Sequence, residues 1–447
     1  MSPLLARTFS SLSVPNYRRY FAGQVVSISG NWMQTVAELW LVVRLTESGL
    51  AVGLTTALQF LPILLFAAWG GVLADRMVKR NLIMVTQLLM AVPALTLWLL
   101  TLTGAIEAWM VFALVFARGL VTAIDNPARQ SFVSEIVGAG RVVNAVALNS
   151  VVIHSSRMIG PAVAGAIIAF VDISACFGLN ALTFVVMFAA LRSMDPADLE
   201  TREPQPSSGR DLRRALRYVA DTPALSIPLG MMAVVGTLAF NFQVLLPLLA
   251  HMTWHGTATT YSALTIAMGA GSVVGALLAG ARGRVSNSLL VGSCFGFGLL
   301  LLAVAAAPTL PLQLAALVAL GSLSVTFASG VNSALQLAVA PDMRGRVMAL
   351  YSMVFLGSTP IGSVIVGWLS EAFSPRAGFA LGAVAALATA VVARAAYRRA
   401  ASTRVREAAP REAPSDPSKY GVGGALKRGS DDPMRSRMRD RQETPTL

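Results

Sequence analysis

Charged residues are scarce in this chain, and their scarcity excludes a soluble domain. Only 13% of the 447 residues are Asp, Glu, Lys or Arg, while 55% are hydrophobic. A soluble domain carries about twice that share of charge, roughly a quarter of its residues. The composition therefore indicates an integral membrane protein.

Cysteines and catalytic motifs are also lacking. The two cysteines, Cys176 and Cys294, lie inside apolar runs, which argues against a disulfide framework. No Gly-x-x-x-x-Gly-Lys-Ser/Thr loop occurs, so ATP-driven transport within this chain is not expected. His251 and His255 are four residues apart but lack the glutamate of a zinc protease motif. We expect no enzyme, no cofactor and no metal site.

The net charge of +13 does not indicate a nucleic-acid partner, because the cations are spread over short loops and a tail instead of forming one basic face. The first apolar run has no small-residue cleavage site after it, which predicts a retained helix and not a signal peptide.

Long apolar runs are what the sequence has in abundance. A transmembrane helix needs about 20 mostly apolar residues, and on that rule we predict an all-α protein with twelve transmembrane helices. The predicted spans are 20–45, 50–74, 81–103, 107–125, 142–170, 173–193, 223–250, 259–281, 286–307, 310–332, 346–370 and 375–396.

The loop within the run Gly71–Arg80 indicates how these spans are oriented in the membrane. It packs Arg76, Lys79 and Arg80 beside Asp75, and cations accumulate in cytoplasmic loops. With this loop inside, the outer loops hold only Arg376, with Arg44 near the end of the first span. The inner side then holds nearly all other loop cations and both termini. We expect a multi-pass protein of the cytoplasmic (inner) membrane.

Five segments follow from this topology. Residues 1–19 form a cytoplasmic N-terminal segment, 20–193 and 223–396 form two six-helix bundles, 194–222 is a cytoplasmic linker, and 397–447 is a basic, disordered cytoplasmic tail. In the linker, four arginines from Arg210 to Arg217 lie opposite Leu212, Leu216 and other apolar residues, which favours a helix on an anionic leaflet. A solvated linker helix is the alternative.

The two bundles have the pattern of a duplication. Gly71-Val-Leu-Ala and Gly275-Ala-Leu-Leu both end a second span, about two hundred residues apart. The same offset relates Ile159-Gly160 and Gly165 to Ile361-Gly362 and Gly367. We therefore expect two pseudo-symmetric six-helix bundles with a substrate site between them near the bilayer midplane.

With these motifs, residues 16–396 resemble the major facilitator superfamily. The run Gly71-Val-Leu-Ala-Asp-Arg-Met-Val-Lys-Arg80 is similar to its signature between the second and third helices, with Val78 where the family usually has glycine. The second-half copy has Ala279 and Gly280 and no acid. Arg157-Met-Ile-Gly-Pro-Ala-Val-Ala-Gly165 is similar to the antiporter signature, with the last glycine one residue later than usual. Asn16–Phe21 and Gln59–Pro62 further resemble the branch of enterobactin exporters and macrolide efflux proteins.

The resemblance implies a conformational latch made of Asp75, Arg76 and Arg80. In the family this carboxylate holds the inner side closed in the outward-facing state, and the missing second acid implies a latch in the first half alone. The alternative is an ordinary solvated loop acid.

Proton coupling is expected from Arg118, Glu38 and Asp125. The resemblance links an arginine of the fourth helix to coupling, and a cation would tune when a neighbouring acid gains its proton. The alternative is a structural ion pair of Arg118 with Asp125 or Glu135. Glu38 is the acid well inside the first span, where a carboxyl tends to be neutral until the cavity wets; alternatively water or Arg44 satisfies it.

The antiporter-like residues Arg157, Gly160, Pro161 and Gly165 are expected to allow close helix contact and a kink. His154 lies three residues from Arg157, on the same helix face, and the two residues would favour an anionic substrate. Taken alone, His154 is more often a hydrogen-bonded core histidine than a proton relay. Further substrate-cavity candidates, each with packing as the alternative, are Phe240, Gln243, Asn332 and Gln336.

These inferences predict a monomeric secondary transporter that exports a small amphipathic molecule by proton antiport and alternating access. Its partners would be the small-molecule substrate, protons and anionic lipids at the cytoplasmic face. One alternative is a proton-coupled uptake permease of the same fold. Another is a non-transporting membrane sensor or scaffold that works through its C-terminal tail.

Overall fold

The computed structural model describes residues 10–199, 211–282, 286–340 and 343–408, whose regular structure is entirely helical. Residues 1–400 form one compact unit, and residues 401–447 are a second. The first-half helices are α2 (Pro15–Thr46), α3 (Gly49–Arg76), α4 (Lys79–Leu102), α5 (Ala108–Val137), α6 (Val142–Phe170) and α7 (Ile173–Arg192). Short 3₁₀ turns lie at Ser10–Ser13, Ala139–Arg141 and Pro196–Asp198.

The second half follows a linker of which residues 200–210 lie outside the described part, as do residues 409–447. The predicted start of the disordered tail at residue 397 is wrong, because the last helix continues to Ala408. The helices of the second half are α8 (Asp211–Asp221), α9 (Pro223–Leu238), α10 (Phe242–Leu248), α11 (Ala258–Arg282), α12 (Asn287–Ala306), α13 (Leu310–Ala338), α14 (Arg344–Gly357), α15 (Thr359–Ala372) and α16 (Pro375–Ala408). A π-helical turn, Leu249–Thr253, extends α10.

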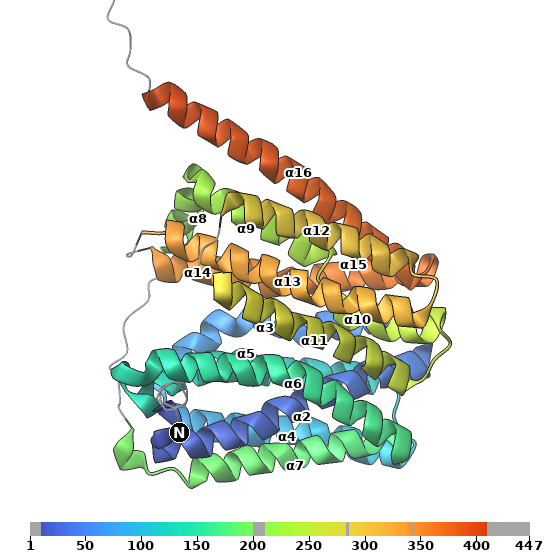
Figure 1. Ribbon diagram of the computed structural model, residues 1–447. Helices are drawn as coiled ribbons and strands as arrows, with labels where there is room; N and C mark the ends of the chain where they lie inside the picture. The colour runs from blue at the N-terminus through green and yellow to red at the C-terminus, as the bar shows by residue number, and fades with distance from the viewer. Residues whose placement is uncertain (1–9, 200–210, 283–285, 341–342, 409–447) are drawn as a thin grey trace, which may run out of the picture. The chain divides into compact units, whose positions relative to one another are not determined.

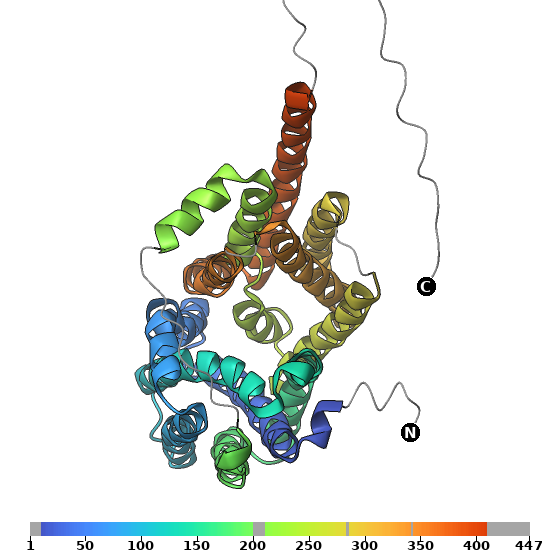
Figure 2. The ribbon, with the colours of Figure 1, turned by 90° about the vertical axis from the view of Figure 1, so that its left-hand side faces the viewer.

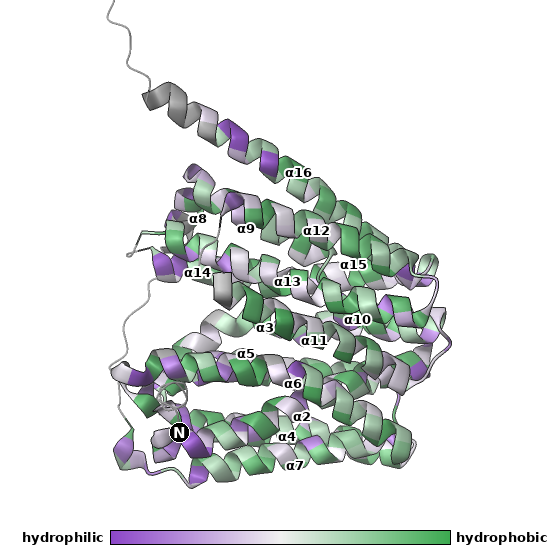
Figure 3. Cartoon of the chain, viewed as in Figure 1, coloured by the Kyte–Doolittle hydropathy of each residue, from purple (hydrophilic) through white to green (hydrophobic). Residues whose placement is uncertain are grey.

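Eleven of the twelve predicted crossings are long and apolar enough to span a bilayer in the part of the chain that the structure describes. Hydrophobic residues dominate these helices between their ends (Figure 3). The exception is α2, whose 32 residues are sufficient in length. Its interior contains Gln24, Gln34 and Glu38, which are buried against other helices and do not face lipid. The prediction of a twelve-helix membrane fold is confirmed, with α2 as a polar-cored crossing.

Two predicted spans are interrupted helices. The span at 223–250 breaks between α9 and α10, where the side chain of Asn241 donates a hydrogen bond to the backbone oxygen of Thr237 (2.7 Å). The span at 346–370 breaks between α14 and α15 at Ser358, shortly before Pro360, which has no amide hydrogen to donate.

The predicted end of the fourth span, near residue 125, is wrong by about three turns. Helix α5 continues to Val137. Asp125 and Glu135 are therefore buried helical residues and not loop acids. The charges are tolerated because Asp125 pairs with Arg129 and Glu135 pairs with Lys79, each at 2.5 Å.

The two halves form separate groups of helices, and they meet along α3 with α15 and α6 with α11 (Figures 1 and 2). The contacts lie at the end where α2 finishes and α3 begins. Here Gly49 and Gly53 cross Gly367 so closely that a Cβ at Gly53 would collide with the backbone oxygen of Ser363. Trp40 packs on Tyr261 with ring centroids 6.2 Å apart. We call this region the closed end.

The opposite end carries the start of α2, the start of α14 and helix α8 (Figure 1). Val219 of α8 is buried, and the hydroxyl of Tyr218 accepts a hydrogen bond from the backbone nitrogen of Ala340 (3.2 Å). Part of the apolar face of α8 therefore packs on the protein, while Leu216 and Arg217 are exposed. The contact of α8 with lipid stays a prediction.

Candidate functional site

A cavity of about 370 Å³ lies between the halves, toward the first half. Helices α2 to α6 supply almost all of its wall, and the second half supplies Gln243 of α10 and Leu356 of α14. The charged lining residues are Arg118, Asp125, Arg129 and Arg157. Most other lining groups are amides and hydroxyls, with Trp32 and Phe60 as the aromatic ones. The wall therefore combines polar groups with apolar surface and carries more positive than negative groups.

Two of the predicted coupling residues, Arg118 and Glu38, form an ion pair beside this cavity. Nη2 of Arg118 donates to Oε2 of Glu38 at 2.5 Å, and both side chains are more than nine-tenths buried. The partners considered from the sequence, Asp125 or Glu135 for Arg118 and Arg44 for Glu38, are wrong for this conformation. The sequence could not relate α2 to α5, because their contact depends on tertiary packing.

The ion pair continues into a buried polar chain across three helices. Gln34 donates to Oε1 of Glu38 at 2.7 Å and accepts a hydrogen bond from Asn180 of α7 at 2.5 Å. Helices α2 and α7 can approach because a Cβ at Gly30 would collide with the side chains of Asn180 and Thr183. Glu38 is thereby held by two donors, and only its partner Arg118 reaches the cavity wall.

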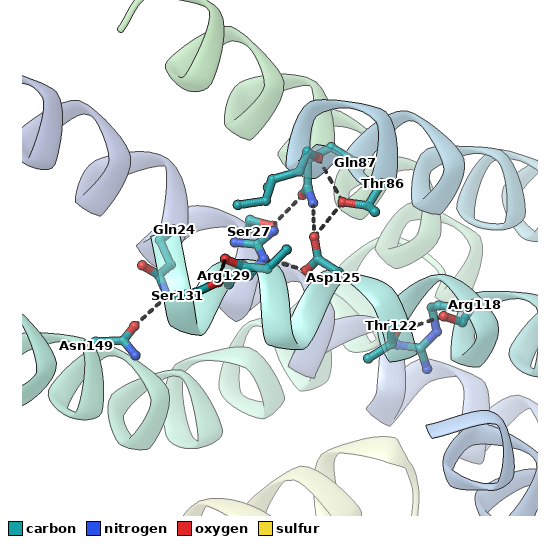
Figure 4. A network of polar contacts seen from close by, with 12 residues as sticks. Gln24, Ser27, Thr86, Gln87, Arg118, Thr122, Asp125, Arg129, Ser131 and Asn149 are labelled. Carbon is teal, nitrogen blue, oxygen red and sulfur yellow. Dashed lines mark hydrogen bonds and ion pairs between the residues drawn. The ribbon is translucent and has the colours of Figure 1, made fainter. Parts of the chain in front are cut away.

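Asp125, the third predicted coupling residue, lies on the same helix as Arg118 but forms a separate hydrogen-bond network (Figure 4). Its Oδ1 accepts hydrogen bonds from Thr86 (2.5 Å) and Gln87 (3.2 Å), and its Oδ2 accepts from Nε of Arg129 (2.5 Å). This carboxylate is satisfied as an anion. The guanidinium of Arg129 also interacts with the buried hydroxyl of Tyr20.

The antiporter-like residues lie on α6 at two helix crossings. A Cβ at Gly160 would lie 2.5 Å from Cβ of Trp32, and one at Gly165 would lie 2.5 Å from the hydroxyl of Ser262. Gly160 thus allows α6 to meet α2, and Gly165 allows it to meet α11 of the other half. Pro161 is buried inside α6. The close approach expected at these positions is present.

Arg157 lies on the same helix, with its guanidinium 5.1 Å from the centre of the Trp32 ring. It is exposed to the cavity, and no carboxylate among the described residues forms an ion pair with it. A cation stacked on an indole face keeps part of its electrostatic stabilisation and stays available to a ligand. The side chain of the neighbouring His154 lies outside the described residues.

The predicted latch residues form no ion pair with one another in the described structure. Asp75 and Arg76 are exposed at the end of α3. Arg80 is buried and donates instead to the backbone oxygens of Leu191 (2.8 Å) and Arg192 (3.1 Å) in the last turn of α7.

Of the predicted cavity residues, Gln243 lines the cavity. Phe240 does not line it; it packs in an aromatic cluster, 5.2 Å from the ring of Phe297. Asn332 and Gln336 bond to each other (2.5 Å) on α13 and are absent from the cavity wall. The sequence thus did not show which face of a transmembrane helix its aromatic and amide side chains occupy.

Comparison with known proteins identifies the family to which this architecture belongs. Residues 6–417 match the model of the transmembrane secretion effector family of the major facilitator superfamily. The chain belongs to this family. Its members are transporters and not enzymes, and the resemblance inferred from the loop after α3 is confirmed.

Individual relatives of this major facilitator chain are distant. Macrolide efflux protein A of Streptococcus pyogenes is 25% identical over 80% of this chain and 89% of its own length. The enterobactin exporter EntS of Citrobacter koseri is 25% identical over 83% of this chain and 91% of its own length. A mutant of the nucleoside transporter NupG shares the fold, with a TM-score of 0.69 and 12% identity over 85% of this chain and 99% of that one. The protein is thus a multi-pass major facilitator transporter with efflux-type relatives.

Proposed function

We propose that the protein exports a small amphipathic molecule in exchange for protons. The ion pair between Arg118 and Glu38 gives this proposal its strongest support, because it holds a protonatable carboxyl directly behind the cavity wall. While Glu38 is ionised, it fixes Arg118. Protonation of Glu38 would remove that attraction and free a cation at the wall, which links the proton to the cavity.

Alternating access would arise from rocking of the halves. With both termini in the cytoplasm, the closed end would face outward, and the cavity would be reached from the cytoplasm in this conformation. Rocking would separate α3 from α15 at the closed end and bring the two halves together near Asp75. We assign Asp75, with Arg76 and Arg80, as the latch of that other conformation.

The direction of transport rests on the relatives, whose names describe efflux of macrolides and export of enterobactin. By the charge distribution of the loops, the protein would lie in the inner membrane with both termini inside. It would act as a monomer of two bundles, 20–193 and 223–396, with α8 against anionic lipids. Of the substrate-contact residues predicted from the sequence, we retain Gln243 together with the residues on α6.

Two rival functions make different predictions. An uptake permease would lower the internal substrate concentration when deleted, whereas an exporter would raise it. A sensor would lose its function when residues 409–447 are removed, whereas a transporter should largely keep its efflux. A substrate for the next test is identified by measuring the accumulation of candidate antibiotics and siderophores. The measurement compares cells that lack the protein with cells that overproduce it.

Proton coupling is tested with that substrate in proteoliposomes. An imposed pH gradient should drive substrate movement by the wild type and not by Glu38→Gln. The matched control is Glu107→Gln, because Glu107 is an exposed acid whose side chain accepts a hydrogen bond from Trp109. Gradient-driven movement that persists undiminished in Glu38→Gln would refute the role of Glu38, and no movement in the wild type would refute antiport.

A further inference from the structure

The charge balance of the cavity wall is uneven. Three guanidinium groups and one carboxylate line it, and Glu38 lies behind. Arg118 is neutralised by Glu38 and Arg129 by Asp125. Arg157 is left over, at the middle of α6 and exposed to the cavity. A cation in a membrane-spanning segment is costly and generally indicates a substrate or ion pathway.

A second observation locates the anion-binding groups. Nε of Arg118 is buried and has no hydrogen-bond partner in the described structure, so the protein does not saturate the guanidinium groups at this wall. Buried polar groups without partners are rare, because burial removes the hydrogen bonds that water would otherwise supply. Arg129 and Arg157 line the same cavity, so an oxyanion there would meet two guanidinium groups, and the one of Arg157 has no carboxylate partner among the described residues.

We propose that the cavity binds a small organic anion, with a carboxylate or phenolate held by Arg157 and Arg129 and a planar part beside Trp32 and Phe60. The inference deepens the proposed export function, because it takes this cavity as the substrate site. Amides and hydroxyls such as Gln59 and Asn149 on the wall suit further oxygen atoms of such a ligand. A cationic ligand finds one lining carboxylate, Asp125, whose two oxygens already accept three hydrogen bonds.

Binding of two dyes with one ring system tests the charge preference. Carboxyfluorescein is anionic and rhodamine 123 is cationic, and both contain a xanthene ring. Fluorescence anisotropy with the purified full chain in micelles, corrected with protein-free micelles, should show saturable binding of carboxyfluorescein and at least about tenfold weaker binding of rhodamine 123. Equal or tighter binding of rhodamine 123 would overturn the proposal.

Substitution of Arg157 tests the site. Arg157→Gln should weaken carboxyfluorescein binding about tenfold or more, the usual size of a lost hydrogen bond to a charged group. Arg157→Lys should fall between, because lysine keeps the charge and loses the planar fork. The matched control is Arg376→Gln, since Arg376 also stacks on a tryptophan, 5.9 Å from the ring of Trp254, and is not part of the cavity wall.

The outcomes separate this proposal from the function it rests on. Equal binding by Arg157→Gln and the wild type, or an equal loss in Arg376→Gln, would overturn the anion site. If Arg157→Gln does not fold, the two dyes on the wild type and Arg157→Lys decide the question. Because binding is measured without a gradient, anion binding with no gradient-driven transport would sink the proposed antiport alone.

Discussion

The two halves of the molecule share a fold but differ in what they bury. The charged residues buried in the described part of the chain, among them Glu38, Arg118 and Asp125, all belong to the first half. The second half buries uncharged polar groups such as Asn241 and Gln313, and an aromatic cluster around Phe240. The two halves thus have the same class of helical architecture, while the buried charges lie on one side of the cavity. This asymmetry suggests that the first half carries coupling and the second half supplies a movable wall.

The largest effect is expected from the ion pair of the first half. Arg118→Met leaves the Glu38 carboxylate buried without its cation, which should lower the free energy of unfolding by about 3–5 kcal/mol. The double variant with Glu38→Gln removes both charges, so it should regain most of that stability and still show no gradient-driven transport. Unfolding in mixed micelles and transport in proteoliposomes measure the two effects. If the double variant is as unstable as the single one, the pair is not the cause.

The twelve crossings, the family and the position of the loop after α3 could be predicted from the sequence, because span length and loop charge depend on local composition. The sequence also singled out Glu38 and Arg118 as candidates for proton coupling, a role that stays a prediction. It could not pair them, since they are 80 residues apart and meet only when α2 packs on α5. The stacking of Arg157 on Trp32 was missed for the same reason.

The misplaced end of α5 has a different cause. Asp125 and Arg129 resemble loop residues when each charge is counted alone. In the structure they neutralise each other within one helical turn, and Thr86 and Gln87 of α4 add hydrogen bonds. A rule that counts charges one at a time ends the helix too early wherever charges are paired inside a bundle.

Next in size is a change in the aromatic cluster of the second half. Phe240→Ala should lower the free energy of unfolding by about 3 kcal/mol through lost burial and a residual cavity. If coupling is confined to the first half, the pH dependence of transport should be unchanged once the rate is corrected for folded protein. A shifted pH profile in this variant would contradict the division of roles between the halves.

A smaller effect is expected at the crossing of α3 and α15, where the halves meet. In Gly53→Ala the new methyl group would clash with the backbone of Ser363, a cost of about 1–3 kcal/mol that falls on the closed-end contact. The closed end should therefore open more often. The control is Gly71→Ala on the same helix, because a Cβ at Gly71 has no neighbour within 4 Å.

Distances across the closed end measure this opening. Spin labels at Arg44→Cys and Phe373→Cys, with both native cysteines replaced by alanine, report on the first and second half respectively. Gly53→Ala should add a longer-distance population, and Gly71→Ala should reproduce the parent distribution. Identical distributions in all three proteins would mean that the crossing does not limit opening.

The smallest effect is expected from the polar contact at the edge of this crossing. Glu371 of α15 accepts hydrogen bonds from the hydroxyl of Ser48 (2.5 Å) and the backbone nitrogen of Leu50 (2.9 Å), so a carboxylate of the second half caps the start of α3 in the first. Because the contact is exposed, water and salt compete with it, and Glu371→Gln should shift the open population by less than about fivefold. The same spin labels measure the shift, with Glu107→Gln as the exposed-acid control. A shift larger than that of Gly53→Ala would mean that charge, and not backbone packing, holds the halves together here, and the contrast between a charged first half and an uncharged second half would then fail at their boundary.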